Sequence, residues 1–283
     1  MTTSLPVPAG AWDCHAHVFG DPGRYPPSPG ADYDPPPAPL GAYLRMLDDH
    51  GLARGVLVQP SVYGFDNRCL LEALDRAEGR LLGVAVPAPD TLAGELEAMH
   101  RRGVRGVRCN LLNSGGLAPE VAVDWQPVLA SLGWHVALQV DVGRIADLRA
   151  YLERFSVPVV VDHMGRPRAG HADPAAPGPR QLIDLVGEGA CFVKLSAPYR
   201  LSAAPPPWPD VTPLARALLD ANPAGCLWAS DWPHPDAGGP VRTADLLEAL
   251  DIWCPPGEAR QTLMVRAPRT LFGTERDVGA PAR

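Results

Sequence analysis

Eight short apolar segments recur along the 283-residue chain, and this repetition restricts the possible fold more than any other feature. Each segment is followed by a stretch with the apolar spacing of a helix. Such an alternation is typical of parallel βαβ units, and eight units close into a (β/α)8 barrel. We therefore predict an α/β fold, a TIM barrel that forms a single domain over residues 1–283. The apolar segments lie at 11–20, 55–60, 81–87, 106–110, 134–140, 157–162, 191–195 and 225–229.

Polar side chains collect where these segments end, not where they begin. The active site of a (β/α)8 barrel lies at the carboxyl ends of its strands. The sequence therefore predicts one polar site in which these side chains meet. The residues at the segment ends are His15, His17, Arg108, Asn110, Gln139, His163, Arg200 and Asp231.

His15 and His17 are the first pair in this set. Side chains alternate across a strand, so the two imidazoles share a face. Together with His163 and Asp231 they form a ligand set that suits one Zn²⁺ or Mn²⁺ ion and leaves a position for water. A histidine considered alone is more often a structural residue bonded to a neighbouring group. The occurrence of all four residues at strand ends favours a functional site.

Charge and composition narrow the range of partners. The net charge of −7 argues against nucleic acid or an anionic membrane as a partner and leaves a small-molecule substrate. The six cysteines form no C-x-x-C pair, and several lie in apolar runs, which predicts a reduced, cytoplasmic chain. No signal peptide is evident, and no apolar run approaches the length of a membrane span.

Six stretches of the sequence resemble the amidohydrolase superfamily. More narrowly, they resemble its amidohydrolase-2 branch, which includes the pyrone dicarboxylate lactonases. The resemblance implies a distorted barrel of the amidohydrolase type and covers nearly the whole chain. The stretches are 13–20 (DCHAHVFG), 59–67 (QPSVYGFDN), 105–110 (RGVRCN), 162–165 (DHMG), 194–200 (KLSAPYR) and 228–235 (WASDWPHP).

The resemblance implies an enzyme that opens a small lactone with water. It gives Asp231 the role of general base, with His15, His17 and His163 as a metal site or as groups that polarise the lactone carbonyl. It also places Arg108 and Arg200 against a substrate carboxylate, a task suited to the fork of an arginine. The residues themselves agree with this chemistry, because a carboxylate beside histidines can take a proton from an attacking water.

The sequence departs from the binuclear members of the superfamily. Those enzymes bridge two metals with a modified lysine or a glutamate on the fourth strand, where this chain has Arg108 and Asn110. The only lysine, Lys194, lies on the seventh strand, and Gln139 occupies a fifth-strand position often held by histidine. We therefore expect one divalent metal (zinc or manganese) at His15, His17, His163 and Asp231, or catalysis without a metal.

The substrate is less sharply defined. We predict that Asn110 and Gln139 bind it together with the arginines, and that Tyr25, Tyr63 and His234 contribute from the loops. The loop at 111–116 carries no cation, so the sequence is compatible with a singly carboxylated, a sugar-type or a neutral lactone. Three alternatives stay open: a metal-dependent decarboxylase of the same branch, a lactone isomerase and a non-enzymatic ligand-binding barrel. The oligomeric state is not predicted.

Overall fold

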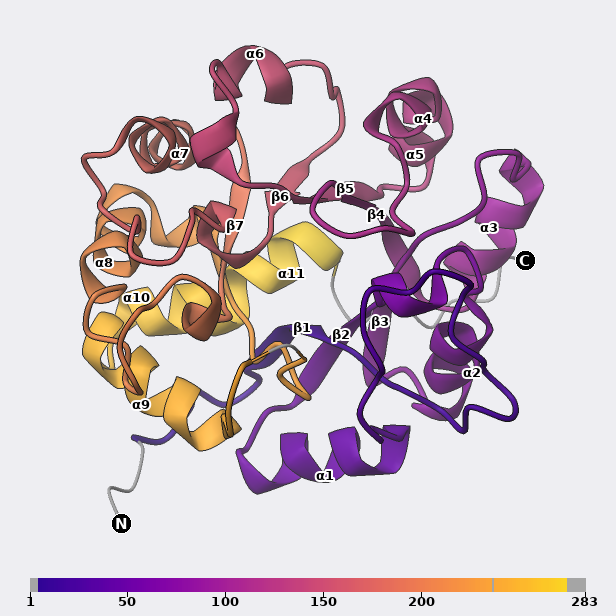
Figure 1. Ribbon diagram of the computed structural model, residues 1–283, viewed down its shortest axis with the longest axis horizontal. Coiled ribbons are helices and arrows are strands. Elements are labelled where there is room, and N and C mark those ends of the chain that lie inside the picture. Colours follow the sequence, from indigo (N-terminus) through magenta and orange to yellow (C-terminus); the bar gives the residue numbers. More distant parts are fainter. Residues whose placement is uncertain (1–4, 236, 274–283) are drawn as a thin grey trace.

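The computed structural model describes residues 5–235 and 237–273 and confirms the barrel. The ends of the predicted domain, 1–4 and 274–283, lie outside the described residues, as does position 236. Eight parallel strands pair in sequence order, and helices surround them (Figure 1). The strands are β1 (Trp12–Ala16), β2 (Arg54–Val58), β3 (Leu81–Ala85), β4 (Val104–Asn110), β5 (His135–Gln139), β6 (Val159–Val161), β7 (Phe192–Leu195) and β8 (Cys226–Trp228).

The barrel closes between β1 and the segment that follows β8. Ala16 forms a parallel bridge with Trp232, and the amide of Asp231 donates to the carbonyl oxygen of His15 at 2.9 Å. The Asp13 carboxylate stabilises the same junction, because it accepts hydrogen bonds from both the amide (2.8 Å) and the hydroxyl (2.5 Å) of Ser230. These contacts fix His15 on β1 and His17 just after it beside Asp231.

The helices follow the predicted alternation, with local differences that have chemical causes. The connection between β4 and β5 contains two helices, Pro119–Asp124 and Gln126–Ser131, and Pro127 near the start of the second lacks the amide hydrogen that a continuous helix would use. The helix between β5 and β6 begins at Leu148, where the Asp147 carboxylate accepts a hydrogen bond from the amide of Ala150. The helices are α1 (Leu40–Asp49), α2 (Arg68–Arg76), α3 (Ala93–Arg101), α4 (Pro119–Asp124), α5 (Gln126–Ser131), α6 (Leu148–Leu152), α7 (Pro177–Gly187), α8 (Thr212–Ala221), α9 (Thr243–Trp253), α10 (Glu258–Gln261) and α11 (Ala267–Phe272).

The C-terminal helix α11 seals the amino-terminal end of the barrel. Phe272 stacks on Trp12 with ring centroids 5.8 Å apart and meets the edge of His135 at 5.3 Å. Inside the barrel the rings of Trp12 and Phe272 join a layer of small and branched side chains from the strands. The interior is therefore packed at this end, and polar side chains have space only at the opposite end. No helix in the described part of the chain has the length and apolar character needed to cross a membrane.

His135 lies against this apolar floor, in edge contact with Phe272, and is buried. Burial and the charge of Lys194 lower its pKa to about 3, against an opposing hydrogen bond with the Arg105 backbone. In the unfolded chain this histidine has an ordinary pKa near 6.5. Between about pH 6.5 and pH 3 the residue is therefore protonated in the unfolded chain but not in the folded chain. Folding stability consequently falls as the pH drops through this window.

We predict that His135→Leu makes the free energy of unfolding less dependent on pH. The expected reduction in slope approaches about 1.4 kcal/mol per pH unit between pH 6 and pH 4. Urea unfolding at a series of pH values measures this slope. His171→Leu is the matched control, because His171 is exposed and its loss should leave the slope unchanged. Equal slopes in wild type and His135→Leu would contradict the assignment.

Candidate active site

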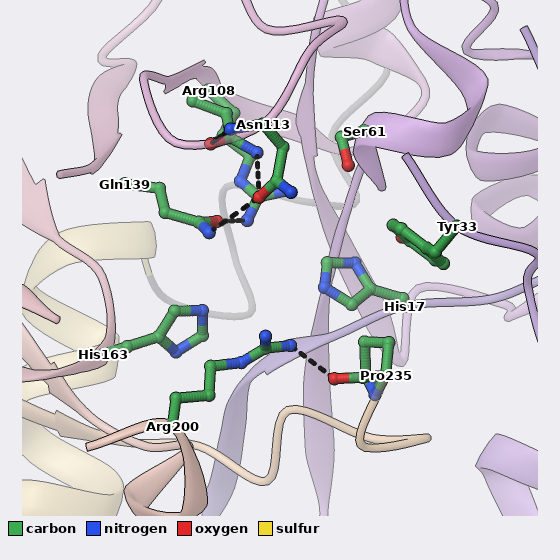
Figure 2. A pocket seen from close by; sticks show the side chains of 10 residues that line it. His17, Tyr33, Ser61, Arg108, Asn113, Gln139, His163, Arg200 and Pro235 are labelled. Atoms are coloured by element: carbon green, nitrogen blue, oxygen red, sulfur yellow. Dashed lines mark hydrogen bonds between the residues drawn. The ribbon is translucent and has the colours of Figure 1, made fainter. Parts of the chain in front are cut away.

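A small polar pocket opens at the carboxyl ends of the strands, as predicted (Figure 2). Six of the predicted residues line it, from five different strand ends. Tyr33, Ser61, Asn113 and Pro235 complete the wall and come from the loops after β1, β2, β4 and β8. The six predicted residues are His17, Arg108, Asn110, Gln139, His163 and Arg200.

His15 and Asp231 lie directly beneath His17, fully buried. The Nε2 atoms of His15 and His17 are 3.3 Å apart. The Oδ1 atom of Asp231 is 3.7 Å from the first and 3.5 Å from the second. His163 packs against this group, with its ring centroid 4.7 Å from that of His15. The structure therefore brings together the four residues that the sequence predicted as the centre of the site.

The two carboxylate oxygens of Asp231 have different surroundings. Oδ2 accepts a hydrogen bond from the Tyr199 hydroxyl at 2.6 Å and from the Arg200 guanidinium at 3.3 Å. Oδ1 faces the two histidines and has no hydrogen-bond partner among the described residues, although it is fully buried. A buried carboxylate oxygen without a partner is costly. Oδ1 is therefore the oxygen available to a water molecule, a substrate proton or a metal ion.

The electrostatics of the site favour the neutral forms of His15 and His163 and the ionised form of Asp231. Burial lowers the pKa of His163 to about 3, and burial together with the charge of Lys194 lowers the pKa of His15 well below its usual range. Burial would raise the pKa of Asp231, but the Arg200 guanidinium beside it holds that pKa well below its usual range. Asp231 is thus ready to accept a proton at neutral pH.

A second buried carboxylate, Asp162, lies at the end of β6. Its Oδ1 is 3.0 Å from Lys194 Nζ and 3.4 Å from His15 Nδ1, and its Oδ2 is 3.6 Å from Arg108 Nε. The Lys194 ammonium is also 3.0 Å from His15 Nδ1. This group connects the floor of the pocket to the arginine in its wall.

The backbone at these strand ends is strained. Seven of the eight described non-glycine residues with positive φ follow β6, β7 or β8, and both His163 (φ 53°) and Asp231 (φ 55°) are among them. The left-handed conformation is unfavourable for side chains of this size and is concentrated at functional sites. The fold therefore holds His163 and Asp231 in a conformation that neither residue prefers.

One wall of the pocket is a network of hydrogen bonds between Arg108 and neighbouring amide groups. Arg108 donates to the Oε1 of Gln139 and to the carbonyl oxygen of Gln59 (3.0 Å), and Gln139 donates to Asn113 at 3.4 Å (Figure 2). Asn113 belongs to the loop after β4, and its neighbour Ser114 donates to Asp32 in the long loop after β1. The two loops therefore hold each other beside the pocket.

Three predicted substrate-binding residues lie elsewhere. The Tyr25 hydroxyl donates to Glu72 on α2 at 2.7 Å, outside the pocket. The Tyr63 ring packs on Phe19, and its hydroxyl accepts from the amide of Gly20. His234 contacts the carbonyl oxygen of Ser230 and the hydroxyl of Thr243. The structure places Tyr33 and Ser61, which the sequence did not single out, at the pocket instead of Tyr25 and Tyr63.

The distances in the cluster fit a zinc ion. Four ligands around Zn²⁺ at about 2.0–2.1 Å lie about 3.4 Å from one another. The three separations among His15 Nε2, His17 Nε2 and Asp231 Oδ1 are 3.3, 3.5 and 3.7 Å. The unpartnered Oδ1 atom supports the same fit. His15, Asp162 and His163 form a second group of potential ligands that shares His15.

Comparison with known families agrees with this geometry. The amidohydrolase family profile matches residues 12–274. The chain belongs to the amidohydrolase family. This confirms the resemblance that the six sequence stretches suggested.

Characterised amidohydrolase relatives cover nearly the whole chain. It is 35% identical over 278 residues to a 4-sulfomuconolactone hydrolase from Hydrogenophaga intermedia, covering 94% of this chain and 90% of the relative. It is 32% identical over 287 residues to a 2-pyrone-4,6-dicarboxylate hydrolase from Comamonas testosteroni, covering 95% and 92%. A crystal structure from Acinetobacter baumannii, described as a probable 2-pyrone-4,6-dicarboxylic acid hydrolase with citric acid bound, superposes with a TM-score of 0.82 at 27% identity, covering 94% and 100%.

Sequence reasoning missed Tyr199, Asp162 and Asn113 as parts of the amidohydrolase site. A signal for two of them was available, since Tyr199 is adjacent to Arg200 and Asp162 to His163. Asn113 lies in a loop without periodicity, and its place in the pocket depends on the fold of that loop.

We predict that Tyr199→Phe lowers kcat about tenfold and leaves KM nearly unchanged. The hydroxyl bonds Asp231 and does not line the pocket, so its loss disturbs the carboxylate rather than substrate binding. Steady-state kinetics measures the two constants. Tyr25→Phe is the control: it removes a hydroxyl bonded to Glu72, and both constants should stay at wild-type values. A change confined to KM in Tyr199→Phe would contradict the assignment.

Proposed function

We propose that the protein hydrolyses a small lactone that carries an anionic group, with Asp231 as the general base. The observation that carries this proposal is the unequal environment of the Asp231 carboxylate. Oδ2 is held by Tyr199 and Arg200, while Oδ1 faces His15 and His17 and has no hydrogen-bond partner among the described residues. The names of the two relatives that match over most of the chain support lactone hydrolysis.

The reaction needs a water molecule, a base and a group that stabilises negative charge. Water attacks the lactone carbonyl carbon, and Asp231 Oδ1 takes its proton as the new C–O bond forms. The ring C–O bond then breaks, and the proton returns from Asp231 to the leaving oxygen. The products are a carboxylic acid and a hydroxyl group on one open chain. Strong hydrogen-bond donors at the pocket wall stabilise the developing oxyanion.

Arg108 and Arg200 supply the positive charge for an anionic substituent. Both guanidinium groups line the pocket, about a tenth exposed or less, at opposite sides of His17 and His163 (Figure 2). Each is already oriented by a backbone carbonyl, Gln59 for Arg108 and Pro235 for Arg200. Arginines fixed in this way bind a carboxylate or sulfonate with little further ordering.

A divalent metal is compatible with the same residues. His15, His17 and Asp231 would hold it, with His163 nearby, and a bound metal supplies polarisation of the carbonyl and a lower pKa for water. The six cysteines are all buried free thiols, which supports a reducing compartment such as the cytoplasm.

A lactone panel tests the proposed function. We expect acid release, followed with a pH indicator in weak buffer, from lactones bearing a carboxylate or sulfonate. Asp231→Asn should lower the rate about 10²- to 10⁴-fold because the amide cannot accept the proton. Circular dichroism of the variant controls for its folding.

Three outcomes would contradict the proposal. Acid release that survives Asp231→Asn would exclude this general base. Release of carbon dioxide from the same compounds would favour a decarboxylase. A product of unchanged mass with a rearranged ring would favour an isomerase.

A further inference from the structure

The only lysine of the chain lies beneath the candidate active site. Lys194 is on β7, and its side chain has no solvent exposure. Its Nζ atom is 3.0 Å from His15 Nδ1 and 3.0 Å from Asp162 Oδ1. The proposed reaction uses neither contact directly. An ammonium group buried at this depth, paired with a carboxylate and a histidine, requires a separate explanation.

The contacts around His15 fix where its proton lies. An ammonium group only donates hydrogen bonds, so His15 Nδ1 accepts from Lys194. A neutral imidazole carries one hydrogen, which must then be on Nε2. That atom is 3.3 Å from His17 Nε2 and points into the cluster.

His17 completes the same pattern. Its Nδ1 is 2.7 Å from the carbonyl oxygen of Val58, which can only accept, so the hydrogen of His17 is on Nδ1. Its Nε2 is therefore an acceptor for the Nε2 hydrogen of His15. Three hydrogen bonds thus run in one direction, from Lys194 through His15 and His17 to Val58, and each imidazole N–H has an acceptor.

This chain of hydrogen bonds competes with a metal. A zinc ion at His15, His17 and Asp231 needs the lone pair of His15 Nε2, the atom to which Lys194 directs the hydrogen. The alternative tautomer places the hydrogen on Nδ1. Its acceptor there would be Asp162 Oδ1 at 3.4 Å, and the hydrogen would meet the Lys194 ammonium at 3.0 Å.

We propose that Lys194 is a positioning residue that fixes the Nε2–H tautomer of His15 and thereby weakens zinc binding at the His15–His17–Asp231 cluster. Zinc binding requires the hydrogen of His15 to move from Nε2 to Nδ1, where it meets the Lys194 ammonium. The ligand distances of the cluster suit zinc, but in the metal-free protein His15 Nε2 carries a hydrogen that is donated to His17. This role concerns the metal alone and does not depend on which lactone is hydrolysed.

The tautomer is measured directly in the wild-type protein. Long-range ¹H–¹⁵N correlation spectra of ¹⁵N-labelled, chelator-treated protein distinguish the two forms, and His15→Gln identifies the His15 signals by their absence. We expect an unprotonated Nδ1 and a protonated Nε2. A protonated Nδ1 would overturn the proposal, and this experiment requires no substitution of Lys194.

Zinc affinity provides the second measurement, by competition with a chromogenic chelator. We expect Lys194→Met to bind one zinc at least tenfold more tightly than wild type, because His15 then donates from Nδ1 to Asp162. Arg108→Met is the matched control: it removes another buried cation near Asp162 but keeps the contact of Lys194 with His15. Its effect should be clearly smaller.

Two results of the zinc titration would overturn the proposal. One is an equal affinity in wild type and Lys194→Met. The other is an equal gain in Lys194→Met and Arg108→Met, which would assign the effect to charge alone. If Lys194→Met does not fold, Lys194→Met/Asp162→Asn removes both members of the ion pair and retains an acceptor for His15 Nδ1. The same gain in zinc affinity is expected of it.

Discussion

The junction between β1 and β8 is the contact on which the site depends. Asp13 on β1 accepts both the amide and the hydroxyl of Ser230, and it also accepts the Tyr43 hydroxyl at 3.1 Å. Burial raises the pKa of Asp13 to about 6, which is the cost of placing a carboxylate in the barrel wall. The hydrogen bonds of Asp13 hold the first and last strands in one register. That register sets His15 and His17, two and four residues after Asp13, beside Asp231, the residue after Ser230.

Charge balance explains the composition of the layer above this junction. Asp162 and Asp231 are fully buried carboxylates, and the cations around them are Lys194, Arg108 and Arg200. Each carboxylate has a cation within 4 Å, so neither is left as an uncompensated buried charge. Three cations against two carboxylates leave one positive charge when the histidines are neutral. A substrate with an anionic substituent completes the balance, in keeping with the proposed lactone class.

The sequence predicted the parts of the molecule that periodicity determines. Eight apolar segments predicted eight strands, and the strand ends predicted the meeting of His15, His17, His163 and Asp231, because barrel geometry brings all strand ends to one mouth. The loops followed no such rule. Tyr25 was predicted at the substrate and bonds Glu72 instead, while Tyr33 of the same proline-rich loop reaches the pocket. The identity of a loop residue at the site depends on turns and long-range contacts, such as Asp32 with Ser114, that have no repeating pattern.

In the proposed mechanism Asp231 removes a proton from water and does not itself attack the lactone. A single turnover in H₂¹⁸O, with enzyme in excess over an anionic lactone that it hydrolyses, tests this directly. The account predicts one ¹⁸O atom in the new carboxylate of the product and none in the peptide that contains Asp231, both measured by mass spectrometry. An unlabelled product together with ¹⁸O in the Asp231 carboxylate would show a covalent intermediate on that residue and would contradict the account.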